Sequence, residues 1–254
     1  MTFSFIVVLV SLKMLILELF KPARKWMPVD NWWAMAFLLN AIGWFTVFIY
    51  GTSLSTWMTE HRLWSADGLG VTGGAALGYL TLSFVNYWWH LLRHKSAFFW
   101  RWFHQIHHSP QRIEVLTTFY KHPLEAFVDS LVAAPILYLV IGLSIKAAAG
   151  ALLLAGLVEI FFHWNIRTPY WLGFIIQRPE SHCVHHQEGL HAYNYADLPI
   201  WDMLFGTFRN PRDWNAKCGM GQEVEPQLIK MLCGVDLTPG KTMTEPSRAN
   251  RAVK

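Results

Sequence analysis

Eleven of the twelve histidines in this 254-residue chain lie between His90 and His191, and eight of these eleven form three short motifs. The motifs are His90-x-x-x-His94, His104-x-x-His107-His108 and His182-x-x-His185-His186. Imidazole is the commonest metal ligand in proteins, so a set of this size predicts a metal centre. Residues three or four apart share one face of a helix, whereas adjacent residues diverge by about 100°. One motif can therefore serve two ions, and eight imidazoles divided between two ions leave positions for a bridging oxygen or O2.

Several further side chains are candidates for this centre. His163 is predicted as a ninth ligand because it ends an apolar segment, and Glu159, one helical turn earlier, is expected to orient it. Additional candidates, as ligands or as groups that hold the ligands, are His122, Glu125, Asn165 and His191. His61 stands apart from the motifs and is predicted to have no role in the centre.

The composition places this centre at a membrane. Hydrophobic residues make up 53% of the chain and charged residues only 15%, whereas a soluble domain carries about 25% charged residues. The net charge of +4 is modest, and the basic residues stand in short clusters beside apolar runs. That pattern favours membrane topology over nucleic-acid binding. Three cysteines without a Cys-x-x-Cys pair argue against a disulfide scaffold and against a cysteine zinc finger.

Five apolar segments are candidates for membrane helices, because about 20 such residues cross a bilayer. They are Thr2–Phe20, Trp32–Tyr50, Leu69–Leu92, Phe127–Leu143 and Lys146–His163. Lys13 and Glu18 weaken the first, which could lie in the interface, and it lacks the basic start and cleavage site of a signal peptide. The last two are short and close together, so we expect a hairpin. The predicted fold is all-α, a polytopic membrane helical bundle of about four to five spans or half-spans with a cytoplasmic histidine-rich helical cap.

The charges of the loops predict the topology. Loop 21–30 carries three basic residues and is expected in the cytoplasm, whereas loop 51–68 carries Arg62 beside Glu60 and Asp67 and is expected outside. Alternation across the remaining spans then brings every histidine from His90 onward to the cytoplasmic face and leaves His61 on the other. We therefore expect an integral membrane protein with its active site on the cytoplasmic face.

The ordered motifs resemble a known family. Three histidine motifs between apolar hairpins are similar to those of the fatty acid hydroxylase and sterol desaturase superfamily of integral-membrane di-iron enzymes. Further elements that resemble this family are His122-Pro-Leu-Glu125, His163-Trp-Asn165, Asn194-Tyr195 and Trp201–Phe208. The resemblance covers roughly residues 77–209, and the family's glycine after Asn-Tyr is Ala196 here. We expect N-terminal membrane spans and a loop at 1–68, a catalytic domain at 69–209 and a polar C-terminal tail at 210–254.

The resemblance implies O2 activation at two irons held by neutral histidines, followed by hydrogen abstraction from an unactivated C–H bond of a lipid. The apolar spans would admit a lipid tail and keep water from the site. Hydroxylation of a sterol, fatty acyl or other lipid is the expected reaction. No His-Pro-Gly-Gly haem motif or Gly-x-Gly-x-x-Gly fingerprint occurs, so electrons are expected from a separate protein of the cytochrome b5, ferredoxin or reductase type.

Three other functions stay open at this point. A lipid or sterol desaturase or C4-methyl oxidase shares the first hydrogen abstraction and the same ligands. A zinc-dependent membrane hydrolase is disfavoured, because catalytic zinc takes about three protein ligands and His-Glu-x-x-His is absent. A metal transporter or metal-binding protein would place histidine or carboxylate at mid-span, whereas these histidines gather at one face. No nucleic-acid partner is expected, and the sequence predicts no oligomeric state.

Overall fold

The computed structural model describes residues 2–239 of the chain, of which residues 2–5 and 50–53 are described by their backbone alone. The α-helices are α1 (Thr2–Phe20), α2 (Trp32–Ser53), α3 (Ser55–Glu60), α4 (Gly70–Lys95), α5 (Ala97–Phe99), α6 (Gln105–His108), α7 (Pro123–Pro135), α8 (Ile145–His163), α9 (Pro179–His185), α10 (Pro199–Phe205) and α11 (Leu228–Leu232). Shorter 3₁₀ turns are Asp67–Leu69, Val115–Thr117, Tyr170–Phe174 and Glu225–Gln227, and π-helical turns are Trp100–His104 and Ile136–Val140. Within the described range no strand forms beyond one isolated bridge, so the predicted all-α fold is confirmed.

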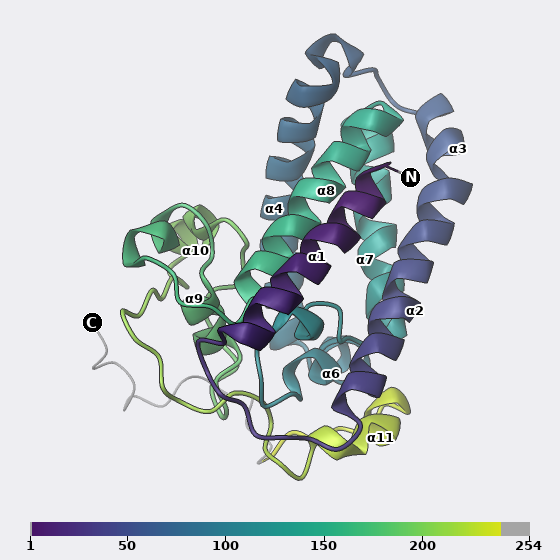
Figure 1. The fold of residues 1–254 in the computed structure, drawn as a ribbon. Helices are drawn as coiled ribbons and strands as arrows, with labels where there is room; N and C mark the ends of the chain where they lie inside the picture. The colour runs from purple at the N-terminus through teal and green to yellow at the C-terminus, as the bar shows by residue number, and fades with distance from the viewer. Residues whose placement is uncertain (1, 240–254) are drawn as a thin grey trace.

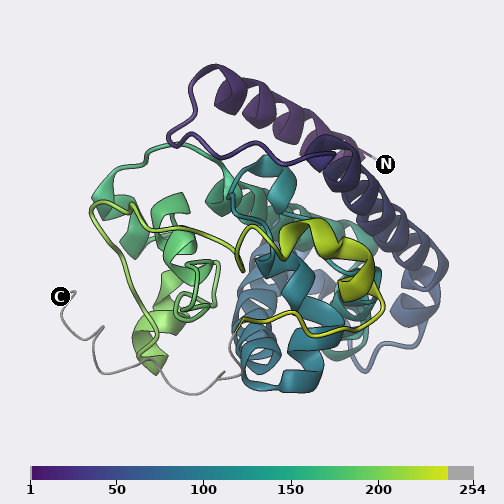
Figure 2. The ribbon, with the colours of Figure 1, turned by 90° about the horizontal axis from the view of Figure 1, so that it is seen from below.

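Five long helices form the body of the molecule and alternate in direction (Figure 1). Helices α1, α4 and α8 run toward the end where α6, α9, α10 and α11 lie, and α2 and α7 run away from it. The chain after α4 and the chain after α8 therefore fold together at that end, as the view from below shows (Figure 2). We call residues 96–122 and 164–239 the cap. The fold thus collects the histidine motifs at one end, as predicted; that this end faces the cytoplasm stays a prediction.

Four helical segments among the described residues are long and apolar enough to cross a membrane. They are Trp32–Ile49, Asp67–Lys95, Pro123–Val140 and Ile145–His163, which agree with four of the five predicted segments. Large apolar side chains on these segments point outward, as contact with lipid requires; Phe45 is 65% exposed and Leu80 is 50% exposed. The protein is an integral membrane protein built as a polytopic helical bundle.

Helix α1, the remaining apolar segment, crosses the face of α8 (Figure 1). Its Glu18 is buried and accepts hydrogen bonds from the backbone N–H groups of Val115 and Asn165, each at 3.1 Å. A buried carboxylate is tolerated when such donors surround it. Glu18 therefore ties the end of α1 to the cap.

The predicted hairpin of the last two spans is present, and the loop before α4 closes its turn. Gly142 has a φ of 74°, and a Cβ there would lie 2.0 Å from the Trp64 carbonyl oxygen. Glycine is required by both the conformation and the close approach. His61 directly follows α3 at this same end, opposite the cap (Figure 1), and it is exposed with Nδ1 2.8 Å from the Trp57 carbonyl oxygen.

The segment 210–239, which belongs to the predicted polar tail, packs against the rest of the cap. It contributes four buried apolar side chains to the core that holds Trp100: Met220, Val224, Leu228 and Met231. The Trp100 indole also donates a hydrogen bond to the Thr238 hydroxyl at 2.7 Å. This part of the chain is therefore folded. Residues 240–254 of the predicted tail lie outside the described residues.

Glycines on α4 allow α8 to approach it closely. A Cβ at Gly78 would lie 2.8 Å from Leu143 and 2.9 Å from Ala151. Small residues at such crossings are the usual means by which membrane helices pack, because lipid supplies no hydrophobic driving force. The position of the α4 histidines relative to the end of α8 depends on this contact.

Gly78→Val is expected to destabilise the bundle by about 1–3 kcal/mol through overpacking. Thermal unfolding in detergent, followed by the loss of monodisperse protein, measures this effect. Gly156→Val on α8 is the matched control, because nothing lies within 4 Å of a Cβ at Gly156 and the change in helix propensity is the same. Equal unfolding temperatures for the two variants would contradict the close approach of the helices.

Candidate metal centre

The cap and the ends of α4 and α8 gather nine histidines into two groups. Group 1 consists of His90, His94, His104, His108 and His185, and group 2 consists of His107, His163, His182 and His186. Each residue offers one ring nitrogen, and within a group these nitrogens all lie within 4.8 Å of one another. The two groups contain all nine residues that the sequence marks as ligands, including the predicted ninth, and no other residue.

Each adjacent histidine pair is divided between the groups. His108 belongs to group 1 and His107 to group 2, and in α9 His185 belongs to group 1 and His186 to group 2. This is the divergence of neighbouring residues on a helix that the sequence predicts. The first of these motifs is not one regular helix, however, because His104 ends a π-helical turn before α6 begins. Turns of this kind insert one residue and are frequent at functional sites.

Within each group the Nε2 atoms are as close as ligands of one ion. In group 1, His104 Nε2 lies 2.9 Å from His90 Nε2 and 3.1 Å from His108 Nε2. In group 2, His163 Nε2 lies 2.9 Å from His182 Nε2. Metal–imidazole bonds are about 2.1 Å long, so two nitrogens at right angles on one ion lie about 3.0 Å apart. The spacings fit one ion per group.

In His90 and His104, the hydrogen bond at Nδ1 shows which of the two ring nitrogens carries the proton. His90 Nδ1 lies 2.8 Å from the Tyr195 carbonyl oxygen, and His104 Nδ1 lies 2.8 Å from the Glu125 carboxylate. A carbonyl oxygen only accepts, so His90 Nδ1 is protonated and Nε2 presents its lone pair; a carboxylate imposes the same tautomer on His104. Two lone pairs that face each other at 2.9 Å repel unless a cation lies between them. The donor set of group 1 therefore fits a metal ion.

Group 2 has the same character. His163 Nδ1 donates to the Glu159 carbonyl oxygen at 2.8 Å, so its Nε2 lone pair faces His182 Nε2. Several buried ring nitrogens have no hydrogen-bond partner among the described residues: both of His94, both of His186, Nδ1 of His107 and His182, and Nε2 of His185. Buried polar atoms in proteins rarely lack a partner. An ion in each group would satisfy the nitrogens that face it.

Burial keeps these imidazoles neutral. It lowers the pKa of His185 to about 3. Burial first, and neighbouring charged groups second, also bring the pKa well below its usual range at His104, His107, His108, His182 and His186. Because neutral imidazole is the form that binds a metal ion, both groups present their ligands in the binding form at neutral pH.

A single loop, residues 191–195, orients part of group 1. The Tyr193 carbonyl oxygen accepts from His185 Nδ1 at 2.7 Å, and the Tyr195 carbonyl oxygen accepts from His90 Nδ1. Acceptors of this kind fix the orientation and the tautomer of a ligating ring. Two histidines from distant segments, α4 and α9, are therefore aligned by one short stretch of backbone.

His191, an uncertain candidate from the sequence, lies at the start of this loop. Its Nδ1 is 3.0 Å from His108 Nδ1, on the side of that ring that faces away from group 1. The φ values of His191, Tyr193 and Asn194 are 41°, 68° and 49°. This left-handed conformation costs free energy in residues other than glycine and is characteristic of functional sites. His191 thus contacts a member of group 1 without belonging to it.

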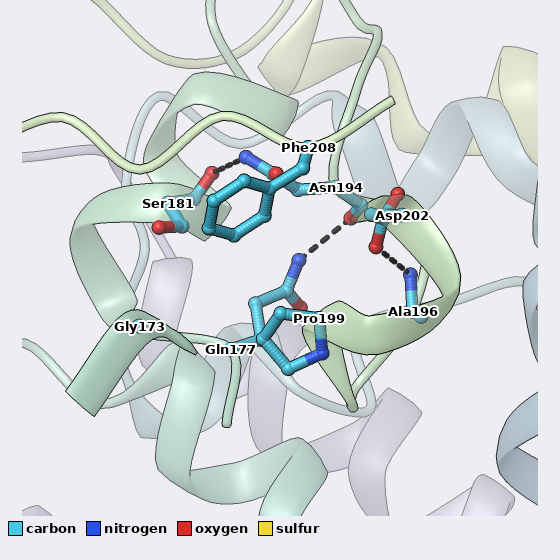
Figure 3. A pocket seen from close by; sticks show the side chains of 8 residues that line it. All are labelled: Gly173, Gln177, Ser181, Asn194, Ala196, Pro199, Asp202 and Phe208. Carbon is cyan, nitrogen blue, oxygen red and sulfur yellow. Dashed lines mark hydrogen bonds between the residues drawn. The ribbon is translucent and has the colours of Figure 1, made fainter. Parts of the chain in front are cut away.

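Asp202 holds the end of the loop through hydrogen bonds, of which the one to Ala196 is visible in Figure 3. Its buried carboxylate accepts hydrogen bonds from the backbone N–H groups of Tyr195 at 2.8 Å and Ala196 at 2.9 Å, and from the Thr207 hydroxyl at 2.6 Å. The backbone of Tyr195 is thus held at both polar atoms: its N–H donates to Asp202, and its carbonyl oxygen accepts from His90. In the sequence, Trp201–Phe208 stands out only because it resembles a family motif. The hydrogen bonds of Asp202 show what this residue does within that motif.

Asn194 is held in the same network. Its side chain donates to the Ser181 carbonyl oxygen at 2.8 Å, and its carbonyl oxygen accepts from the Gln177 side chain at 2.6 Å (Figure 3). Ser181 directly precedes His182, so the network also fixes the start of the third histidine motif. Gln177 could not be recognised in the sequence, because an isolated glutamine in a loop has no characteristic spacing.

Glu125, another candidate, lies outside both groups but contacts one of them. It is fully buried, and its carboxylate binds His104 and also forms an ion pair with Arg93. Arg93 lies 3.8 Å from Asp129, whose other carboxylate oxygen is 3.5 Å from Lys121. Buried charges persist when they are paired in this way. Glu125 therefore orients His104 while its own charge is compensated.

His122 is placed away from the two groups. It precedes α7, where its Nδ1 accepts from the Leu124 backbone N–H at 3.0 Å, and its Nε2 lies 3.2 Å from the Leu232 carbonyl oxygen. Both ring nitrogens are engaged in holding the start of the helix. The structure therefore gives this residue a capping position and does not bring it to the centre.

Glu159 and Asn165 were expected to support the metal ligands with their side chains, but these side chains bind other groups. The Glu159 carboxylate binds Lys121 at 3.1 Å, and it is the backbone carbonyl of Glu159 that holds the His163 ring. The Asn165 side chain donates to the Arg24 carbonyl oxygen at 2.9 Å and accepts from the Arg24 N–H at 3.0 Å. Asn165 thus connects the chain after α8 to the chain after α1.

Comparison with known proteins identifies several relatives. An ornithine lipid hydroxylase of Rhizobium tropici is 34% identical over 160 residues, which cover 61% of this chain and 47% of that protein. A very-long-chain aldehyde decarbonylase of Oryza sativa is 28% identical over 132 residues, which cover 50% of this chain and 51% of that protein. A delta(7)-sterol-C5(6)-desaturase of Nicotiana tabacum is 22% identical over 201 residues, which cover 77% of this chain and 63% of that protein.

The chain spans about half the length of the first two of these relatives. No solved structure gives a significant match. The family model described as fatty acid hydroxylase matches residues 75–207, more than half of the chain. The matched region contains every histidine of groups 1 and 2 as well as Asp202 and the loop that it holds. The chain belongs to the fatty acid hydroxylase family.

Proposed function

We propose that this protein is a membrane-bound, O2-dependent oxidoreductase that holds two irons and oxidises a C–H bond of a lipid, with hydroxylation as the reaction. The observation that carries the proposal is the pair of buried histidine groups at the end of a membrane bundle. One group contains five histidines and the other contains four. The names of the relatives, an ornithine lipid hydroxylase and a sterol desaturase among them, support a lipid substrate.

The size and chemistry of the two groups favour iron over zinc. Catalytic zinc sites use about three protein ligands and structural zinc sites about four, commonly with cysteine. Group 1 offers five imidazoles, and neither group contains a cysteine or a carboxylate among the described residues. Imidazole is a good ligand for iron.

The chain's own residues prepare the site in three ways. Neutral imidazoles would bind the ions without offsetting their positive charge, and the Glu125 carboxylate contacts His104 at Nδ1, the ring nitrogen opposite the Nε2 that faces group 1. Trp100, only 1% exposed, packs on His94 and His108 with ring centroids 5.3 and 5.2 Å apart and keeps water from the cap side of group 1. When bound, the two ions supply the activation of O2 that oxidation of an unactivated C–H bond requires.

The membrane side of the centre is formed by the spans themselves. His90 and His94 lie in the last turns of α4, and His163 is the last residue of α8. A lipid tail that enters between spans would thus meet both groups from the bilayer, without crossing water. Electrons would come from a separate protein of the cytochrome b5, ferredoxin or reductase type at the cytoplasmic face, where the positive-inside pattern puts the cap.

A lipid or sterol desaturase is the alternative for the same site, because both reactions begin with the same hydrogen abstraction. The sterol desaturase relative matches the larger share of this chain, 77%. Comparative lipid mass spectrometry of cells with and without the gene decides between them. We expect a lipid that gains one oxygen atom from O2 when the protein is present. Loss of two hydrogens would identify a desaturase, and an unchanged lipid profile in an O2-supplied cell would contradict the proposal.

His107→Ala and His185→Ala are each expected to abolish turnover and to reduce bound metal by about one ion per chain, since each removes a ligand from a different group. Metal analysis of the purified protein and a lipid oxidation assay measure these effects. His61→Ala is the control, because His61 lies at the opposite end of the bundle, and it should change neither. Full activity in either of the first two variants would remove that histidine from the ligand set.

Asp202→Asn tests the support of the loop. An amide can accept from the Tyr195 N–H but places donors against the Ala196 N–H, so the acceptor for His90 should shift. We expect metal affinity about 10–100-fold weaker, measured by competition with a chelator in the purified protein. Asp30→Asn, an exposed carboxylate in the loop before α2, should have no effect. Unchanged chelator resistance in Asp202→Asn would show that the loop does not support the centre.

A further inference from the structure

A pocket formed in part by the segments that follow α1 and α8 contains three arginines, Arg24, Arg167 and Arg212, none of which forms an ion pair among the described residues. The pocket has a volume of about 580 Å³, part of it open to solvent. It is lined by Ala23, Arg24, Arg167, Thr168, Glu180, Arg212, Asp213, Trp214 and Asn215. These residues come from the chain after α1, the chain after α8, the start of α9 and the segment after α10.

Arg24 is held in place but its guanidinium is not satisfied. The Asn165 side chain bonds to both the N–H and the carbonyl oxygen of Arg24, and Ala23 N–H donates to the Asn165 carbonyl oxygen at 2.9 Å. The guanidinium lies over the Trp214 ring at 5.5 Å, yet its Nη1 is buried with no hydrogen-bond partner among the described residues. Buried donors of this kind call for an acceptor. Asn165 therefore positions a cation that has no hydrogen-bond acceptor at Nη1 in the described part of the chain.

The acidic groups of the pocket do not supply that partner. The Glu180 carboxylate accepts from the backbone N–H and the hydroxyl of Thr168, at 2.9 and 2.7 Å, and pairs with Arg178 at 3.1 Å. Asp213 is exposed, and no ion pair joins it to Arg24 among the described residues. Arg167 and Arg212 add two more positive charges to the lining. The pocket therefore has an excess of positive charge around an unsatisfied N–H donor.

The position of the pocket indicates where an anion would come from. Arg24 follows the end of α1, and Arg167 follows the end of α8, one of the candidate spans. Phe20, at the end of α1, is 81% exposed, and three basic residues follow it directly in loop 21–30. Such a change from apolar to basic residues marks the level of lipid headgroups.

We propose that this pocket binds a phosphate group, supplied by a lipid headgroup or by free phosphate, through the guanidinium groups of Arg24, Arg167 and Arg212. Guanidinium groups bind phosphate oxygens through strong charge-assisted hydrogen bonds. Two lining residues are close in the chain to histidines of group 2, because Arg167 follows His163 by four residues and Glu180 precedes His182 by two. Resting on the proposed function, a lipid held here by its phosphate would be a substrate anchored beside the metal centre.

The test uses the full chain in detergent with dioleoyl phosphatidic acid as the probe and dioleoylglycerol, which lacks the phosphate, as its counterpart. Native mass spectrometry counts the lipids bound per chain, and a titration gives the affinity. We expect wild-type protein to bind one phosphatidic acid in preference to dioleoylglycerol. Arg24→Gln and Arg167→Gln should each bind it at least about tenfold more weakly, because each loses a charge-assisted contact. Testing two positions keeps the test valid if one variant fails to fold.

Lys25→Gln is the matched control, since it removes the same charge from the neighbouring, exposed position. Inorganic phosphate, added as a competitor, distinguishes the sources: displacement only at millimolar concentration identifies the lipid headgroup, and displacement at micromolar concentration identifies free phosphate. Equal binding of the two lipids, or an equal loss in Lys25→Gln and Arg24→Gln, would overturn the proposal. The measurement needs neither O2 nor turnover, so its result is independent of whether the protein oxidises a lipid.

Discussion

The mutual repulsion of imidazole lone pairs is the constraint on which the rest of this structure depends. Hydrogen bonds to Tyr195 and Glu125 fix the tautomers of His90 and His104, so their Nε2 atoms face each other at 2.9 Å without a proton to share. In an enclosed site no water screens that repulsion. Only a cation resolves it, and in group 2 the buried ring nitrogens without a hydrogen-bond partner among the described residues call for a cation as well. A fold that assembles these nine residues is therefore a fold for binding metal ions.

Each layer of the molecule contributes to this assembly. The alternating spans bring the end of α4 and the end of α8 to the same level, and close packing at Gly78 sets their separation. The cap then adds the two motifs in which adjacent histidines diverge. Finally, backbone carbonyls and two buried carboxylates, Asp202 and Glu125, determine the ring orientations. The polar groups of the cap thus orient the histidines, whereas the apolar surface of the bundle is free to contact lipid.

The grouping of the nine histidines and the general fold could be predicted from the sequence because both depend on local spacing. Helical periodicity relates His90 to His94 and separates His107 from His108, and the lengths of the apolar segments give the spans. The surrounding groups could not be predicted in this way. Asp202 acts through the peptide at Tyr195, and Asn165, expected near the metal, instead grips the backbone of Arg24.

Three other features of the structure differ from what the sequence predicts, again because contacts outside the local pattern determine them. Glu159 holds its histidine through a backbone carbonyl, which every residue possesses and no side-chain pattern reveals. His122 has the residue type of a ligand, but its place before a proline at the start of α7 makes it a cap. Residues 210–239 are polar overall, yet a few apolar side chains suffice to fix them to the cap. Contacts between segments distant in the chain decide all three cases.

Anaerobic titration of the metal-free, detergent-purified protein with ferrous iron, followed by Mössbauer spectroscopy, tests the central claim most directly. The claim is that groups 1 and 2 are separate sites, each of which binds one ion. The account predicts saturation at two irons per chain and two resolved iron environments, since group 1 offers five imidazoles and group 2 offers four. Saturation at one iron, or no uptake of iron by a protein that retains zinc, would contradict it.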